Sequence, residues 1–188
     1  KRYFEIGIVL ITLTTTLYSS YTSHQLPLQL CSISSIVLVP GILIFRKRIC
    51  SDLLVYCGAW GSLLAIITPG LNAQSAWGFY ILYFISHGCN VFTALYAITI
   101  LDEVLDKKSL VNTIIYGNLY LILLSVYDYV AHTNYMFLAH KPPFETLFNA
   151  MSPWPWYIIE GEFIGLTIGV FTYISIKYLR QYFSTKKE

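Results

Sequence analysis

A thiol and an imidazole are the side chains of this sequence best suited to covalent chemistry. Cys31 ends the segment Leu26-Pro27-Leu28-Gln29-Leu30-Cys31, and His87 ends Phe84-Ile85-Ser86-His87. Pro27 suits the first turn of a helix, and a helix N-terminus favours a thiolate. Apolar surroundings disfavour the thiolate, and His87 is expected about 8 Å from the level of Cys31 along the helix axes. Composition and spacing alone therefore leave Cys31 a structural residue.

Ionisable side chains within apolar runs form a second set with potential chemistry. His87, Asp128 and Glu160 are each costly in hydrocarbon, so they are expected to face a bundle interior or an aqueous cavity. Interhelical hydrogen bonding explains polar residues such as Asn112 and Asn118 without any site. The three ionisable side chains therefore predict an outward-facing polar cavity.

The composition indicates which elements must position these residues. Of 188 residues, 56% are hydrophobic and only 12% are charged, which is too apolar for a soluble domain of this length. A bilayer core about 30 Å thick takes roughly 20 apolar residues per helix. The sequence predicts an all-α, polytopic transmembrane bundle in a single domain, residues 1–188. Its six expected spans are residues 3–21, 28–45, 52–71, 76–101, 110–130 and 156–179.

The basic residues predict the orientation of these spans. All twelve Lys and Arg residues except Lys141 fall on one side of a six-span arrangement. Lys and Arg in short loops stay cytoplasmic, so both termini of this cell-membrane protein are expected in the cytoplasm. Because the basic residues are spread over separate loops, membrane lipids and not nucleic acids are the expected partners. Residues 3–21 lack a signal-peptide cleavage site and are expected to be a true span.

Glycine and cysteine spacing allows two further predictions. Gly161, Gly165 and Gly169 form a seam of small residues, through which the last helix is expected to approach another helix, within the bundle or in a homo-oligomer. The four cysteines lack zinc-site spacing and are not placed for a disulfide framework. Neither a metal ion nor another cofactor is expected.

Several separated motifs resemble those of the YwaF family of integral membrane proteins. The resemblance covers nearly the whole chain and implies a polytopic α-helical bundle. It also implies a relation to eukaryotic phospholipid acyltransferases for which a cysteine nucleophile is proposed. The motifs, in chain order, are Leu26 to Cys31, Thr68-Pro69-Gly70, Phe84-x-x-His87, Asn134-Tyr135-Met136-Phe137-Leu138 with Lys141-Pro142, and Pro153-Trp154-Pro155-Trp156-Tyr157.

The resemblance assigns chemistry to individual residues. It implies that Cys31 takes an acyl chain from a phospholipid as a thioester and passes it to a lysolipid or another acceptor, with His87 as the general base. Asn134, Tyr135 and Lys141 would then hold the lipid phosphate.

The chain departs from the family pattern in two places. Gln29 stands where the family commonly has His, so His87 or His24 must act as the base. Family members often have another apolar helix before residue 3, and the chain lacks an initiator Met, so this chain is expected to be shortened.

A non-catalytic function is the alternative, namely the substrate-binding component of a vitamin transporter. Aromatic side chains around an outward-facing cavity would stack on a flat heterocycle, and polar side chains would anchor it. In either case the cavity is expected between the second, fourth, fifth and sixth spans and the loop of residues 132–157. The substrate-binding candidates are Gln29, Asp128, His132, Asn134, Tyr135, Lys141, Trp154, Trp156, Tyr157 and Glu160.

Overall fold

The structure is a computed structural model in which three stretches of the chain are described. These stretches are residues 1–69, 77–143 and 146–185. Five residues used in the predictions lie outside the described residues: Gly70, Leu71, Ala76, Lys186 and Lys187.

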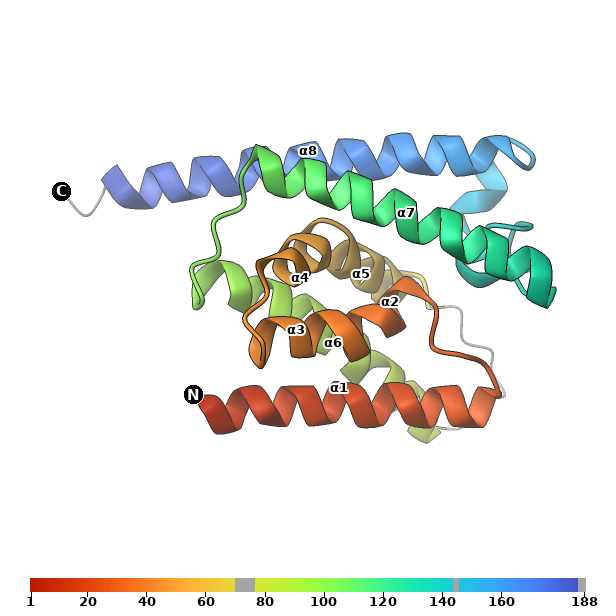
Figure 1. The fold of residues 1–188 in the computed structure, drawn as a ribbon, viewed down its shortest axis with the longest axis horizontal. Helices are drawn as coiled ribbons and strands as arrows, with labels where there is room; N and C mark the ends of the chain where they lie inside the picture. Colours follow the sequence, from red (N-terminus) through yellow and green to blue (C-terminus); the bar gives the residue numbers. More distant parts are fainter. Residues whose placement is uncertain (70–76, 144–145, 186–188) are drawn as a thin grey trace.

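Within the described residues the chain forms six helical rods and no strand (Figure 1). The predicted all-α fold is therefore confirmed, and the rods follow the predicted runs within a few residues at most ends. The rods and short helices are α1 (Arg2–Ser23); α2 (Leu30–Ile33) with π-helical η1 (Ser34–Leu38) and α3 (Val39–Leu43); α4 (Arg48–Leu53) with π-helical η2 (Leu54–Gly58) and α5 (Ala59–Ile67); α6 (Trp77–Thr99); α7 (Lys107–Ala131); η3 (Tyr135–Phe137) and η4 (Leu147–Ala150); and α8 (Trp156–Thr185).

Among the described residues, four rods are long and apolar enough to cross a membrane. They are Arg48–Ile67, Trp77–Thr99, Lys107–Ala131 and Trp156–Tyr182. The second rod is apolar but shorter, at Leu30–Leu43, and α1 is rich in Ser and Thr. The structure thus supports a multi-pass membrane protein, while six spans and their orientation remain a prediction.

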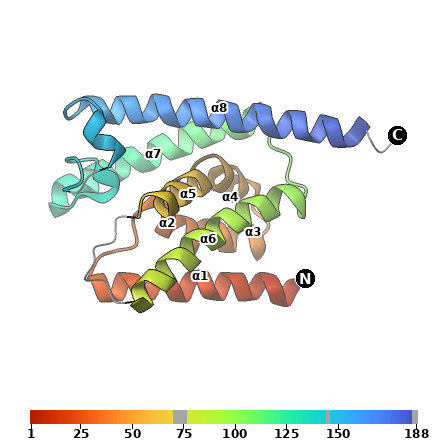
Figure 2. The ribbon, with the colours of Figure 1, turned by 180° about the vertical axis from the view of Figure 1, so that it is seen from behind.

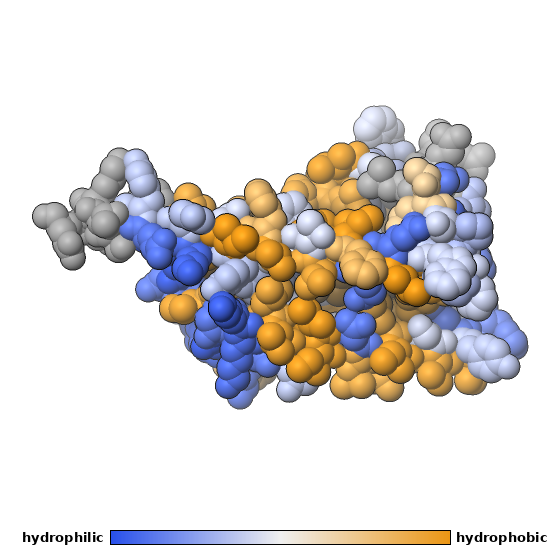
Figure 3. All heavy atoms as spheres, turned by 90° about the horizontal axis from the view of Figure 1, so that it is seen from above, coloured by the Kyte–Doolittle hydropathy of each residue, from blue (hydrophilic) through white to orange (hydrophobic). Residues whose placement is uncertain are grey.

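The rods are arranged in layers that both ribbon views show. In Figures 1 and 2, α7 and α8 run along one side of the molecule and α1 along the opposite side. The two short rods lie between them, and α6 crosses this region obliquely. Figure 3 looks onto the α7 and α8 side, where hydrophobic side chains form a broad band and hydrophilic ones gather toward the C-terminal end. Such a band is suited to lipid contact.

Pro40 and Gly58 mark two local features of the short rods. Pro40 lacks the N–H that an α-helix would donate to the carbonyl of Ile36, and π-helical η1 immediately precedes α3. Gly58 lies where the two rods touch, because a Cβ there would stand 2.3 Å from Ser34 Oγ. The rods therefore approach closely just beyond Cys31.

A capping box begins α7 and ties it to α4. Asp106 Oδ1 accepts a hydrogen bond of 2.8 Å from the Ser109 backbone N–H, and Arg48 Nη2 lies 2.9 Å from Asp106 Oδ2. The Ser109 N–H and the Arg48 guanidinium together lower the pKa of Asp106 to about 2. At the same end of the molecule, buried Glu5 of α1 pairs with Arg46 and accepts from the Tyr96 hydroxyl at 2.8 Å.

Candidate active site

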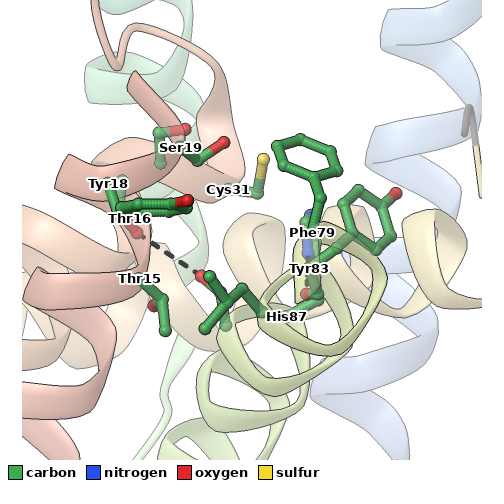
Figure 4. A pocket seen from close by; sticks show the side chains of 11 residues that line it. Thr15, Thr16, Tyr18, Ser19, Cys31, Phe79, Tyr83 and His87 are labelled. Atoms are coloured by element: carbon green, nitrogen blue, oxygen red, sulfur yellow. Dashed lines mark hydrogen bonds between the residues drawn. The ribbon is translucent and has the colours of Figure 1, made fainter. Parts of the chain in front are cut away.

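A small pocket of about 50 Å³ brings Cys31 and His87 to the same place. Figure 4 shows the Cys31 sulfur between Ser19 of α1 and Phe79 of α6. The half-buried Cys31 comes from α2, and the buried His87 comes from α6. The lining residues are Thr15, Thr16, Tyr18, Ser19, Cys31, Ser32, Phe79, Leu82, Tyr83, Ser86 and His87.

The His87 ring is fixed in one tautomer by its own helix. Its Nδ1 lies 2.7 Å from the carbonyl oxygen of Tyr83, and a carbonyl can only accept, so Nδ1 carries the proton. The Tyr83 and His87 rings lie 4.2 Å apart between centroids, and the Tyr83 hydroxyl donates to the Ala65 carbonyl at 3.0 Å. In the neutral imidazole the remaining nitrogen, Nε2, is therefore a proton acceptor.

Asn90 holds the backbone of Cys31 through a fully buried amide. Its Nδ2 donates to the Cys31 carbonyl at 3.0 Å and to Ser62 Oγ at 3.1 Å. Its Oδ1 accepts from Ser35 Oγ at 3.0 Å, and the same hydroxyl lies 3.1 Å from the Cys31 carbonyl. Ser86 extends this network, because its hydroxyl lies 3.2 Å from that of Ser35. Cys31 thus sits on a rigid, hydrogen-bonded support shared by α5, α6 and η1.

A second cavity of about 110 Å³ adjoins the first and shares Thr16, Ser19 and Ser32 with it. It lies between α1 and the connection to α2, and Gln29 lines it. Its other lining residues are Ser20, Ser23, Gln25, Leu26 and Pro27. The two pockets are therefore built by α1, α2 and α6 with residues 25–29, whereas the predicted cavity included the fifth and sixth spans in place of α1.

Asp128 and Asn134 hold together the chain that leaves α7. Buried Asp128 accepts from the Thr133 hydroxyl at 2.6 Å and from the Tyr135 N–H at 2.9 Å. Asn134 Oδ1 accepts from the backbone N–H groups of Ala139 and His140, at 2.9 and 3.1 Å. These carboxylate and amide groups satisfy backbone N–H donors where the chain turns after α7.

His132, another substrate-binding candidate, ends α7 in the left-handed conformation, with φ 52°, and is exposed. Its backbone N–H donates to the Asp128 carbonyl. His132 lines neither pocket.

The Trp-Pro-Trp segment is bonded to the same loop. The Trp154 indole N–H donates to the Leu138 carbonyl at 3.1 Å, and the Tyr157 hydroxyl donates to the Phe137 carbonyl. Lys141 Nζ donates to the Met151 carbonyl at 2.7 Å and lies 5.7 Å from the centre of the Tyr157 ring.

The remaining candidates of this loop are Trp156 and Glu160. Glu160 accepts from the Ser152 N–H at 3.0 Å and from the Ser152 hydroxyl. Trp156 is 61% exposed. Neither residue lines either of the two pockets.

Gln29 connects this loop to the start of α2. Gln29 Oε1 accepts from the Met136 N–H at 3.1 Å, and the Tyr120 hydroxyl of α7 donates to the Leu28 carbonyl at 2.5 Å. The loop residues thus fix the segment that presents Cys31, while they do not line its pocket.

One protein-family match extends over the part of the chain that contains both pockets and the loop. The model of the TMEM164 family matches residues 2–173, which include both pockets and the loop between α7 and α8. The chain belongs to the TMEM164 family. No curated protein and no solved structure matches it. The TMEM164 family match and the apolar helices together show a membrane protein.

Residue types alone did not predict the contribution of α1 to the pockets of this TMEM164 family protein. Thr12, Thr16, Ser19 and Ser23 recur at steps of four, three and four residues, which places them on one face of a helix. Three of them line the pockets. A hydroxyl-bearing face on an otherwise apolar helix was the sequence signal that could have found them.

Proposed function

We propose that this TMEM164 family protein is a membrane-embedded acyltransferase that works through a thioester on Cys31. The donor is a phospholipid and the acceptor is a lysolipid. One observation carries the proposal: the Cys31 thiol and the His87 imidazole line the same pocket. Nucleophilic acyl transfer needs a thiol and a general base in one site, and with Nδ1 directed at the Tyr83 carbonyl, Nε2 is the His87 nitrogen that can accept the proton.

The proposed reaction has two halves. In the first, His87 Nε2 takes the thiol proton, and the Cys31 sulfur attacks the carbonyl carbon of a phospholipid ester. The carbon–oxygen bond breaks, and the departing lysolipid oxygen takes the proton from His87. In the second half, His87 takes a proton from an acceptor hydroxyl, whose oxygen attacks the thioester. The carbon–sulfur bond breaks and the sulfur regains the proton, so the enzyme returns to its first state.

The resemblance to the YwaF family and its acyltransferase relatives agrees with this chemistry. Where that family commonly has His, this chain has Gln29, whose oxygen is already bonded to the Met136 N–H. His87 is therefore the proposed base. Asn134 and Lys141 remain proposed contacts to a lipid phosphate. To bind it, the Asn134 side chain would release the His140 carbonyl and the Lys141 side chain would release the Met151 carbonyl.

The proposed topology has six spans with both termini in the cytoplasm of the cell membrane. The pairs Arg46–Glu5, Arg48–Asp106 and Arg180–Asp102 join the chain segments that this topology assigns to the cytoplasmic side. Trp154 and Trp156 belong to the proposed outer side, where an aromatic belt is expected. Cys31 then stands near the outer leaflet, at the depth of phospholipid esters.

The test is mass spectrometry of the Cys31 peptide after incubation with phospholipid vesicles, with and without hydroxylamine. We expect a fatty-acyl adduct that hydroxylamine removes, and its loss in the Cys31→Ser variant. Cys57→Ser is the matched control, because Cys57 lies outside both pockets, and it should keep the adduct. An unmodified Cys31 in the presence of the donor, with a small molecule co-purifying, would contradict catalysis and favour a binding component.

A further inference from the structure

The cavity beside the Cys31 pocket is lined mainly by hydroxyl and amide side chains, with Leu26 and Pro27 as its apolar members. Hydroxyl and amide side chains from Thr16, Ser19, Ser23, Gln25 and Gln29 surround it, and no charged side chain lines it. Among the described residues, the hydrogen bonds that link Ser19 and Gln25 to other side chains use their backbone carbonyls, which accept from the Thr22 and Ser20 hydroxyls, and not the Ser19 hydroxyl or the Gln25 side-chain amide. The lining therefore offers both hydrogen-bond donors and hydrogen-bond acceptors to a ligand.

The size of the cavity suits a small polar group. Roughly 10–15 Å³ admits one water molecule, whereas this cavity measures about 110 Å³. That space accommodates several heavy atoms of a polyol. An anionic phosphate is a poorer match, because phosphate sites usually supply a cation or a cluster of backbone N–H groups.

The position of the cavity relates it to the thioester. Thr16, Ser19 and Ser32 line both cavities, so the second cavity adjoins the one that Cys31 lines. Figure 4 shows Thr16 and Ser19 of α1 on the side of the pocket that faces the Cys31 sulfur.

We propose that this hydroxyl-lined cavity is the acceptor subsite and binds the uncharged, hydroxyl-bearing glycerol portion of the acyl acceptor. The inference rests on the proposed acyl transfer. The bound hydroxyl oxygen attacks the thioester carbonyl carbon while its proton passes to His87 Nε2. The carbon–sulfur bond then breaks, an ester forms, and the Cys31 sulfur takes the proton back. Water in the same cavity would instead release a free fatty acid.

The experiment separates the two half-reactions in the full-length protein. Protein is first loaded from vesicles of phosphatidylcholine with a labelled acyl chain, and the Cys31 thioester is quantified. It is then chased with monoacylglycerol, which carries glycerol hydroxyls and no charge. Thioester loss, labelled ester and labelled fatty acid are measured separately.

Three variants test the subsite. Ser19→Ala removes one hydroxyl, and we expect KM for monoacylglycerol to rise roughly three- to ten-fold. Ser23→Leu fills the second cavity alone, and we expect the chase to slow at least roughly ten-fold while thioester formation stays unchanged. Thr14→Val is the matched control, because Thr14 is an exposed α1 residue that lines neither cavity.

The outcomes distinguish this inference from the proposed function. A thioester that forms normally but is chased at the wild-type rate in both Ser19→Ala and Ser23→Leu would overturn the acceptor subsite alone. Release of fatty acid without ester would also overturn it and assign the cavity to water. Failure of the wild-type protein to form any thioester with the donor would overturn the proposed function, and the subsite with it.

Discussion

At the scale of single residues, Asn90 holds the backbone from which the Cys31 thiol projects. Both of its amide hydrogens and its oxygen are used, toward Cys31, Ser62 and Ser35. Because Asn90 is fully buried, these partners cannot turn to water when the amide is lost. The amide thus joins three rods at the point from which the nucleophile projects.

Asn90→Leu should therefore destabilise the protein and disturb the site. We expect a loss of about 1–3 kcal/mol in the free energy of unfolding, because buried hydroxyls and the Cys31 carbonyl lose partners. The rate of Cys31 thioester formation should fall as well. Unfolding in mixed detergent micelles and the hydroxylamine assay measure the two effects.

Asn112→Leu is the matched control for Asn90→Leu. Asn112 lies on α7, is half-buried and has no side-chain hydrogen bond within the described part of the chain. Its replacement should leave both measurements near the wild-type values. Equal effects of the two variants would contradict the special role given to Asn90.

Three of the candidate site residues, Cys31, His87 and Gln29, line the two pockets. Cys31 and His87 were paired through a family resemblance, since their proximity depends on how α2 packs against α6 and not on their spacing. Asn134 and Lys141 have side chains typical of ligand binding, yet both bond to the backbone of their own loop. A loop without regular hydrogen bonds needs such partners, and sequence alone does not distinguish the two uses.

At the scale of elements, hydropathy predicts the helical rods but not the π-helical segments within two of them. Apolar runs predicted every rod, because length and hydropathy suffice for a helix in a bilayer. They did not predict η1, which immediately precedes the turn that contains Pro40, or η2, which ends at Gly58. These local features set the close approach of Gly58 to Ser34, just after Cys31.

Gly58→Ala tests this contact. The added Cβ would stand 2.3 Å from Ser34 Oγ of the neighbouring rod and 2.9 Å from Leu54 Cδ1 of its own rod, so both side chains must shift and the Ser34 hydroxyl must leave the Leu30 carbonyl. We expect a loss of about 1–3 kcal/mol in the free energy of unfolding. Gly117→Ala on α7 is the control, since nothing lies within 4 Å of its Cβ, and it should be neutral or stabilising by up to about 1 kcal/mol. A neutral Gly58→Ala would show that the two rods are not tightly packed there.

At the scale of the whole molecule, the second rod is shorter than a bilayer core is thick, and Cys31 lies near its start. The rod Leu30–Leu43 has 14 residues, or about 21 Å, against about 30 Å for the hydrocarbon core. Gln29 links its start to the loop after α7, and the Tyr120 hydroxyl links the preceding Leu28 carbonyl to α7 itself. The short rod thus lets Cys31 meet lipid at ester depth if the loop lies outside.

That orientation is the last prediction, and labelling of single cysteines tests it. In a background with the four native cysteines replaced, Ala139→Cys in the exposed loop should react with a membrane-impermeant maleimide on intact cells. Lys47→Cys, exposed between the second and third rods, should react only after the cells are permeabilised, because Lys and Arg loops are retained inside. Thr14→Cys, within α1, should remain unlabelled in both conditions. Labelling of Lys47→Cys on intact cells, with Ala139→Cys protected, would reverse the topology and move Cys31 to the cytoplasmic leaflet.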